Sequence, residues 1–333
     1  MPKTDMPLAE LRCYCGSSPR PADYDRYWQK ALEQALCLPL DYTLEPGDFS
    51  TDQVVCSHLY FNSIGGARIH AQLMLPQART AACPVLLLFH GYEGHTHDWY
   101  EKLPFALSGI AVLAMDVRGQ AGLSQDNGIW EGSTFQGHIV RGIRANNPEQ
   151  LFYRNVYLDT VVLARIVRSF AWADASHITA AGFSQGGALA LACSALCAQG
   201  GLPMEYTVSG YPFLCDFVRM YESGFTNRAV DELSLYFRLQ DPLHKTEQRF
   251  FELLGYLDVE WMAEKICNPV RMFSGLCDAV VPPSTHFAAY NHLACAQKEM
   301  LVYPDHGHED LPGAWMGILK LLLGQEHIAA SAF

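Results

Sequence analysis

The chain has 333 residues, half of them hydrophobic and 17% charged, a balance typical of a globular protein with a well-buried core. Its formal net charge of −12 argues against nucleic acid or an anionic membrane as a partner. We find no apolar h-region of a signal peptide and no apolar run long enough to span a membrane. Eleven cysteines without disulfide-like or zinc-like spacing favour the reducing cytoplasm.

Strand-like and helix-like patterns alternate along the chain. A helix is predicted at 21–38, followed by an antiparallel hairpin of strands at 54–61 and 68–75. Apolar runs then predict inner strands at 85–89, 110–115, 178–181, 206–210, 270–275 and 300–303. Helical patterns separate several of these strands, at 98–107, 156–170, 188–196 and 311–323. This alternation is what a mostly parallel central sheet flanked by helices requires.

The residues from 182 to 186 read Gly-Phe-Ser-Gln-Gly, between a predicted strand and a predicted helix. G-x-S-x-G in that context is the nucleophile elbow of α/β-hydrolases, whose sharp turn would expose Ser184. Gly182 and Gly186 are expected because side chains there would collide with the neighbouring strand and helix. The backbone N–H of Gln185 is then an expected oxyanion donor. Glycine-rich turns without a catalytic role are also common, so an acid and a base must be found elsewhere.

His90, Gly91 and Tyr92 directly follow the predicted strand at 85–89. In α/β-hydrolases a His-Gly turn after the third strand supplies the second oxyanion N–H, which here is the backbone N–H of Tyr92. A histidine that merely ends a strand is the alternative reading.

Asp278 and His308 each come just after a predicted strand, and the order Ser184, Asp278, His308 is that of the α/β-hydrolase triad. His308 is expected to take the Ser184 proton and return it to the leaving alcohol. Asp278 is expected to hold the imidazole tautomer and stabilise the imidazolium.

Other residues compete for these roles. Asp258 lies in a helical stretch, the wrong element for the acid, and Asp305 is only three residues from His308. The spacing alone leaves His306 open as the base. A non-catalytic binding protein of the same fold would be expected to have lost a triad member, and none is missing.

A metal-dependent hydrolase is a further alternative. Residues 95–98 read His-Thr-His-Asp, the opening of the H-x-H-x-D-H pattern of binuclear metallohydrolases, but position 99 is Trp rather than the pattern's final His. His306 and His308 would have to be recruited as further ligands. We favour the serine mechanism and expect no metal and no cofactor.

Residues 213–266 break the strand–helix alternation with helical pieces. Insertions at this point of α/β-hydrolases commonly cap the active site. No repeat, low-complexity tract or linker divides the chain, so we expect residues 1–333 to form a single α/β-hydrolase domain with this helical insertion.

The chain resembles the cephalosporin C deacetylase and acetyl xylan esterase family, carbohydrate esterase family seven. The shared signatures are Arg118-Gly119-Gln120, the elbow, and His308-Glu309, and the similarity runs from about residue 5 to residue 323. Further similar passages lie at 89–92, 115–120, 137–142, 156–167, 211–214, 282–285 and 303–309. The resemblance implies that His308 is the base rather than His306.

The resemblance also implies the substrates. Members remove acetyl groups from acetylated xylo-oligosaccharides, acetylated sugars and cephalosporin C, through an acyl-enzyme intermediate. It implies an intracellular homo-hexamer, a dimer of trimers, whose inner cavity excludes polymeric xylan. A short-chain carboxylesterase or a thioesterase of another substrate class is the alternative that the elbow equally permits.

Residues around the predicted triad are assigned supporting roles. Tyr92, Pro212 and Val280 are predicted to line a short apolar acyl pocket. Three other residues are expected to be architectural, with an arginine–carboxylate pair beside His308 holding its loop in register: Arg118, Gln120 and Glu309.

Two positions depart from the family pattern. Phe183 stands where Gly is expected in many members, and Glu93 stands where Asn is expected. We expect both to alter the pocket and to leave the chemistry intact.

Overall fold

The computed structural model describes residues 4–78, 81–131, 138–225 and 228–330. Residues 1–3, at the N-terminus where no signal peptide is expected, and Gly137 of the family-like passage lie outside the described residues. In the described part of the chain, no helix combines the length and the apolar character needed to cross a bilayer.

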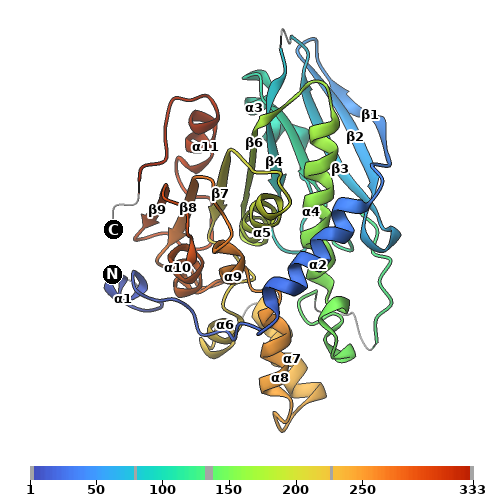
Figure 1. The fold of residues 1–333 in the computed structure, drawn as a ribbon. Helices are drawn as coiled ribbons and strands as arrows, with labels where there is room; N and C mark the ends of the chain where they lie inside the picture. Colours follow the sequence, from blue (N-terminus) through green and yellow to red (C-terminus); the bar gives the residue numbers. More distant parts are fainter. Residues whose placement is uncertain (1–3, 79–80, 132–137, 226–227, 331–333) are drawn as a thin grey trace.

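A nine-stranded sheet in the order β1-β2-β3-β5-β4-β6-β7-β8-β9 forms the centre of the molecule (Figure 1). β1, β2 and β3 are antiparallel, β3 is antiparallel to β5, and the strands from β5 to β9 are parallel. The strands are β1 Tyr42–Ser50, β2 Val54–Asn62, β3 Arg68–Pro76, β4 Cys83–Phe89, β5 Ala111–Met115, β6 Ala173–Phe183, β7 Tyr206–Gly210, β8 Val270–Gly275 and β9 Lys298–Tyr303. The predicted α/β-hydrolase fold is confirmed.

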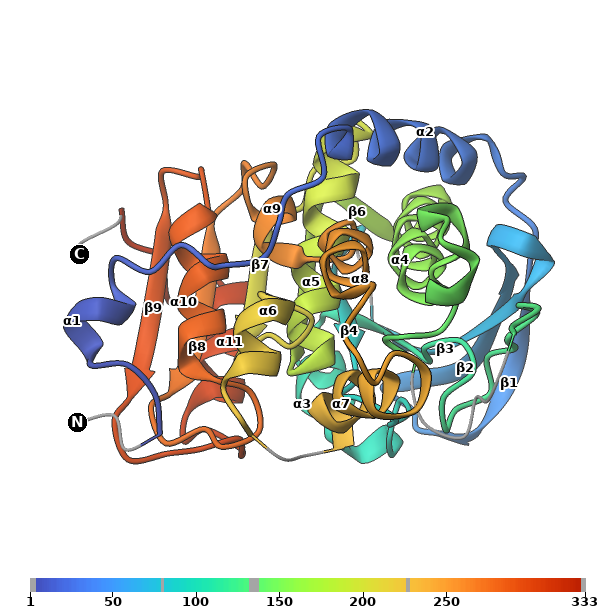
Figure 2. The ribbon, with the colours of Figure 1, turned by 90° about the horizontal axis from the view of Figure 1, so that it is seen from below.

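Helices cover both faces of the sheet (Figure 2). Buried side chains of α2, α4, α5, α9 and α10 pack on one face, and those of α3 and α11 pack on the other. The α-helices are α1 Leu8–Leu11, α2 Tyr24–Cys37, α3 Leu103–Leu107, α4 Phe152–Ser169, α5 Gln185–Gln199, α6 Phe217–Glu222, α7 Arg228–Gln240, α8 Glu247–Gly255, α9 Val259–Ala263, α10 Pro283–His292 and α11 Ala314–Leu322.

The continuously apolar inner strands follow from these two layers. Val85 and Leu87 of β4 belong to the core under α4 and α5, whereas Leu86 belongs to the core under α3 and α11. Because alternate residues of a strand point to opposite faces, a sheet covered on both faces needs apolar residues at every position.

Most predicted elements are present, and the differences have identifiable causes. The edge strand β1 is absent from the prediction because it contains Pro46 and Gly47, and its register shifts after Pro46, as an edge strand tolerates. The helix α10 is also absent from the prediction. It is buried almost all round, from Pro283 to Tyr290, so it has no polar face that would reveal a helical period. The helix expected at 98–107 is a 3₁₀ turn, Trp99–Lys102, followed by α3.

The stretch 213–266 contains α6, α7, α8 and α9. In Figure 1, α6, α7 and α8 gather at one end of the molecule, at the bottom of the view. The helical pieces expected within 213–266 are therefore present.

Candidate active site

Ser184 lies at the sharp turn between β6 and α5, with φ 56° and ψ −123°. Its backbone N–H donates to the carbonyl oxygen of Gly210 over 2.9 Å, and its own carbonyl accepts from the N–H of Phe213 over 3.1 Å. A positive φ at a residue with a side chain is costly and is found mainly where function requires it. These backbone bonds hold Ser184 in this conformation.

The elbow glycines are confirmed as steric requirements. A Cβ atom on Gly186 would lie 2.0 Å from the carbonyl oxygen of Phe89 in β4. One on Gly182 would lie 2.4 Å from the carbonyl carbon of Gly186. The strand and the helix therefore approach each other too closely for any side chain at either position.

His308 lies between Ser184 and Asp278. Its Nε2 is 3.0 Å from the Ser184 Oγ, and its Nδ1 is 2.8 Å from the Asp278 Oδ2. Since a carboxylate can only accept, the proton is on Nδ1 and Nε2 faces the hydroxyl as an acceptor. Asp278 is fully buried, and its Oδ1 accepts from the backbone N–H groups of Val280 and Val281 over 2.8 and 2.9 Å. This arrangement can take a proton from the Ser184 hydroxyl.

The competing residues make other contacts. The ring of His306 packs against Tyr303, with 5.5 Å between centroids. Asp258 caps α9 by accepting from the N–H of Glu260, and Asp305 is exposed in the turn after β9.

The residues of the metal alternative are not assembled into a ligand group. The rings of His95 and His97 pack against each other at 5.0 Å, and Asp98 caps the 3₁₀ turn at Trp99–Lys102. Over the described ranges, no group of three or more metal-ligating side chains includes His95, His97, His306 or His308.

The two expected oxyanion donors come from different loops. Gln185 is the first residue of α5, so its N–H has no acceptor within the helix. Tyr92 follows the His-Gly turn after β4. The N–H of Ser184 is already engaged by Gly210, which leaves the following residue as the donor on the elbow.

His90 joins the Tyr92 loop to the end of β5. Its Nδ1 donates to the carbonyl oxygen of Gly91 over 2.7 Å, and its Nε2 accepts from the N–H of Val117 over 2.9 Å. Burial lowers the pKa of His90 to about 4, so the imidazole stays neutral and Nε2 can accept. His90 therefore connects the loop that carries Tyr92 to the end of β5, in addition to ending β4.

Arg118 and Glu309 do not form the arginine–carboxylate pair that was expected beside His308. The Arg118 guanidinium donates to both carboxylate oxygens of Asp159 in α4, over 2.7 and 2.6 Å, and both residues are buried. Glu309 is exposed and accepts from the N–H of Gly307 within its own loop. The expected arginine–carboxylate pair beside His308 is therefore wrong, because a buried guanidinium takes a buried carboxylate as its partner.

The residues expected to line the acyl pocket have different environments. The Tyr92 ring packs edge-on against Phe213 and His138, at 5.5 and 5.8 Å between centroids. Pro212 is buried beside Phe213, whereas Val280 is 36% exposed.

Glu232 of α7 was missed by the sequence analysis. Its carboxylate accepts from the backbone N–H groups of His138 and Ile139 over 3.3 and 2.9 Å, and the Tyr92 hydroxyl accepts from the same N–H of His138. Burial raises the pKa of Glu232 to about 8. A single glutamate in a helical pattern does not indicate from sequence that it will contact a loop 93 residues earlier in the chain.

His286 was also missed. It is fully buried in α10, its Nε2 lies 3.9 Å from the Asp278 Oδ2, and its Nδ1 lies 3.0 Å from the Ser274 Oγ. Burial lowers the pKa of His286 to about 4, so a second, neutral imidazole faces Asp278.

The two departures from the family pattern have distinct structural settings. The Phe183 ring packs against Tyr211 and Trp315, and a Cβ on Gly210 would lie 2.0 Å from the Phe183 Cδ1. Glu93 has a φ of 56°, a conformation that Asn adopts more readily than Glu.

A cavity of about 510 Å³ is lined by residues of 128–131 and of the segment that follows His138. Aromatic contacts connect it to Tyr92, from Trp130 to Phe152 at 6.1 Å and from Phe152 to His138 at 5.0 Å. Side chains that line it include Trp130, Arg141, Arg144, Glu149 and Asn155.

Comparison with known proteins assigns the family. Residues 1–319 match the model of the acetyl xylan esterase (AXE1) family. The chain belongs to the acetyl xylan esterase family. This membership supports ester hydrolysis, and deacetylation in particular, as the class of reaction.

Three relatives illustrate the similarity to this family. Acetyl xylan esterase 1 from Thermoanaerobacterium sp. JW/SL YS485 is 40% identical, with a TM-score of 0.92 over 97% of this chain and 100% of that one. An acetyl xylan esterase from Paenibacillus sp. R4 is 33% identical, with a TM-score of 0.89 over 96% and 99% of the two chains. The acetyl esterase Axe7A of Xylanibacter ruminicola is 25% identical over 86% of this chain, which spans 63% of that relative's length.

Proposed function

We propose that this protein is a serine esterase that removes acetyl groups from small acetylated substrates. The observation that carries the proposal is the hydrogen-bonded series from Asp278 through His308 to Ser184, with the serine at a strained elbow. Membership in the acetyl xylan esterase family supports the acetyl group as the one removed.

In this mechanism the Ser184 Oγ attacks the acetyl carbonyl while the His308 Nε2 takes the hydroxyl proton. The oxyanion is bound by the backbone N–H groups of Tyr92 and Gln185. His308 then protonates the leaving alcohol, and Ser184 remains as an acetyl ester. Water, deprotonated by the same imidazole, releases acetate. Asp278 holds the ring and stabilises the imidazolium.

The proposed substrates are acetylated xylo-oligosaccharides, acetylated sugars and cephalosporin C. The cavity lined by Trp130 supports a carbohydrate, because its lining combines an aromatic ring with polar side chains such as Arg141 and Glu149. Cephalosporin C rests on the family resemblance alone. A carboxylesterase or thioesterase for other short acyl chains is the alternative.

The test is activity together with labelling of the serine. Ser184→Ala should lose ester hydrolysis by many orders of magnitude while staying folded, because triad residues act as a unit. A fluorophosphonate should label Ser184 alone, and Ser108→Ala, at an exposed serine, should behave as the wild type. Acetylated xylo-oligosaccharides should be preferred over acetyl thioesters. Full loss of activity on chelation by EDTA, with the protein still folded, would instead support the metal-dependent alternative.

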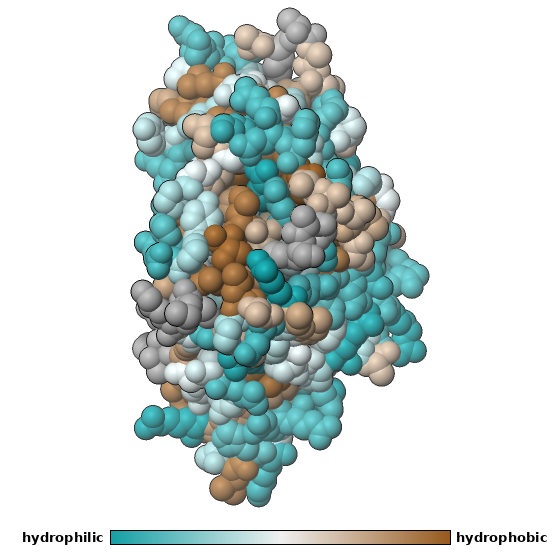
Figure 3. All heavy atoms as spheres, turned by 90° about the vertical axis from the view of Figure 1, so that its left-hand side faces the viewer, coloured by the Kyte–Doolittle hydropathy of each residue, from teal (hydrophilic) through white to brown (hydrophobic). Residues whose placement is uncertain are grey.

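We also propose that the chain works in the cytoplasm as a homo-hexamer. The 11 cysteines are all free thiols, which suits a reducing compartment. A strip of apolar surface faces outward on the side that carries β9 (Figure 3). Exposed apolar side chains of β9 and of α11 with its C-cap are Leu301, Trp315, Met316 and Leu323. Light scattering should give six times the 37.1 kDa chain mass, and cell fractionation should recover the protein with cytoplasmic markers.

A further inference from the structure

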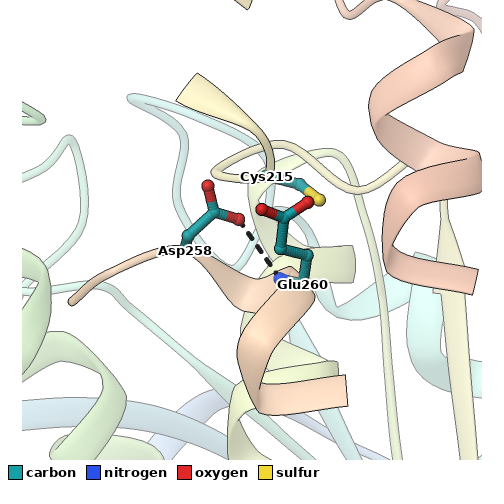
Figure 4. A group of neighbouring side chains, drawn as sticks. All are labelled: Cys215, Asp258 and Glu260. Carbon is teal, nitrogen blue, oxygen red and sulfur yellow. Dashed lines mark hydrogen bonds between the residues drawn. The ribbon is translucent and has the colours of Figure 1, made fainter. Parts of the chain in front are cut away.

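Cys215, Asp258 and Glu260 form a fully buried group that does not include the triad residues (Figure 4). The Cys215 sulfur and one carboxylate oxygen from each of Asp258 and Glu260 lie within 4.8 Å of one another. Cys215 comes from the loop between β7 and α6, Asp258 caps α9, and Glu260 lies within α9. Figure 4 shows the Glu260 carboxylate turned toward the other two side chains.

Glu260 is the unusual member of the group. Among the described residues, neither carboxylate oxygen of Glu260 has a hydrogen-bond partner, although the side chain is fully buried. The carboxylate lies against the backbone of Gly16, where an added Cβ would be 2.0 Å from the Oε2. A buried carboxylate without a donor is strongly disfavoured, so the Glu260 oxygen atoms point to a bound cation that they can coordinate.

The groups that act most strongly on Glu260 are all acidic, although Glu264 among them pairs with Arg20 over 3.4 Å. The charged neighbours that act on it are Asp258, Asp216, Cys15 and Glu264, and each of them raises its pKa. Burial, reinforced by these neighbours, raises the pKa of Glu260 to about 11, and burial raises that of Asp258 to about 7. The Arg219 guanidinium forms its ion pair with Asp5. A cation would remove this repulsion.

We propose that Cys215, Asp258 and Glu260 bind a zinc ion. A thiolate with two carboxylates suits Zn²⁺, because Mg²⁺ and Ca²⁺ take oxygen ligands only. The Cys215 thiol donates to the Thr285 carbonyl oxygen over 3.1 Å, and zinc binding would replace this hydrogen bond. Binding requires Cys215 and Glu260 to release protons to the solvent.

The position of the site indicates a structural role. The N-terminal segment runs across α10 and α9 on its way to α2 (Figures 1 and 2), and Tyr14 and Ser17 donate to Asp216 over 2.7 and 2.8 Å. The ion would join the Cys215 loop to α9 beneath this segment. Because none of its ligands contacts Ser184, zinc should change stability and leave the chemical step alone.

The experiment uses the full chain, treated with a chelator and then titrated with Zn²⁺. We expect one ion per chain in equilibrium dialysis and a rise in the thermal midpoint of roughly 5 °C at saturation. Acetyl ester hydrolysis measured at low temperature should be the same with and without zinc. Co²⁺ should give the thiolate-to-cobalt absorption expected of a cysteine ligand.

Variants distinguish zinc binding from simple protonation of the buried carboxylates. Glu260→Gln and Cys215→Ser should each lose the zinc-dependent rise, whereas Cys193→Ser, at a buried cysteine outside the group, should keep it. If a ligand variant does not fold, the cobalt spectrum and the dialysis of the wild type decide. The proposal is overturned if the wild type binds no zinc, or if both ligand variants bind zinc as the wild type does. It is also overturned if Glu260→Gln by itself raises the thermal midpoint by the amount expected of zinc, because a neutral side chain would then be enough to relieve the buried group.

Discussion

Gln120 and Gln185 form a reciprocal amide pair: the Gln120 Nε2 donates to the Gln185 Oε1 over 2.7 Å, and the Gln185 Nε2 donates to the Gln120 Oε1 over 3.0 Å. The same Gln185 Oε1 accepts from the Tyr153 hydroxyl over 2.7 Å, and the Gln185 Nε2 also lies 3.3 Å from the carbonyl oxygen of Gly91. Since Gly91 precedes Tyr92, this side chain connects the two loops that carry the proposed oxyanion donors.

Gln120→Ala should therefore reduce kcat/KM for acetyl esters by about tenfold to a hundredfold, because small displacements of oxyanion donors are costly. The variant should also lose about 1–3 kcal/mol of unfolding free energy, since buried groups lose a partner. Steady-state kinetics and denaturant unfolding measure the two effects. Gln29→Ala, on the exposed face of α2, is the matched control. Wild-type kinetics in Gln120→Ala would show that Gln120 does not position the oxyanion loops.

His308 should make hydrolysis fall on the acid side. Only the neutral imidazole can accept the Ser184 proton, so protonation of His308 removes the base. His308→Ala should lower kcat by about 10⁴-fold or more, whereas His306→Ala should stay within a few fold of the wild type. The measurement is kcat/KM against pH for all three proteins. A flat profile from mildly acidic to mildly basic pH would count against a histidine base, and equal losses in the two variants would count against our choice of His308.

Glu232 should make part of the stability depend on pH. Burial raises its pKa from an ordinary 4.5 to about 8, so the folded chain holds a proton that the unfolded chain has released. Its contribution is full below about pH 4.5 and is lost as the pH rises toward 8. The free energy of unfolding of the wild type relative to Glu232→Gln should therefore fall across this window.

Denaturant unfolding at several pH values between 4.5 and 8 checks this expectation for Glu232. Glu33→Gln, at an exposed position of α2, should follow the wild type throughout. Parallel curves for the wild type and Glu232→Gln would mean that Glu232 ionises as freely in the folded chain as in the unfolded one.

Acyl length should be restricted at the site. A long acyl tail would push the carbonyl away from the Tyr92 and Gln185 N–H groups, so kcat/KM should fall from acetyl to propionyl to butyryl esters of one alcohol. Val280→Ala should raise the butyryl to acetyl ratio several fold by enlarging the pocket. Val55→Ala, at a valine of similar exposure in β2, is its control. Equal rates across acyl lengths would contradict a short pocket.

Polymer size gives a separate expectation. If the sites open into the cavity of a hexamer, acetate should be released from soluble xylo-oligosaccharides and hardly at all from insoluble xylan. Acetate release from both substrates at matched acetyl content is the measurement. Efficient attack on the polymer would contradict enclosed sites.

The sequence by itself determined the elements whose pattern is local. The hairpin of β2 and β3 follows from a period of two residues, the apolar strands β4 to β8 from continuous apolar runs, and the long helices α2 and α4 from a period of 3.6 residues. The elbow at Ser184 could also be predicted from the sequence. Its glycines are required by close contacts with Phe89 and Gly186, and any turn of this kind creates such contacts. These features depend on neighbours along the chain, or on a motif that fixes its own surroundings.

The tertiary structure decided what depends on distant partners. It paired Arg118 with Asp159 rather than with Glu309, brought Glu232 onto the loop at His138, and gathered Cys215 with Glu260. It also folded α10, whose burial on all sides erases the amphipathic period. A charged side chain buried by the fold takes whichever partner the packing brings within reach, and a sequence window contains no information on that distance.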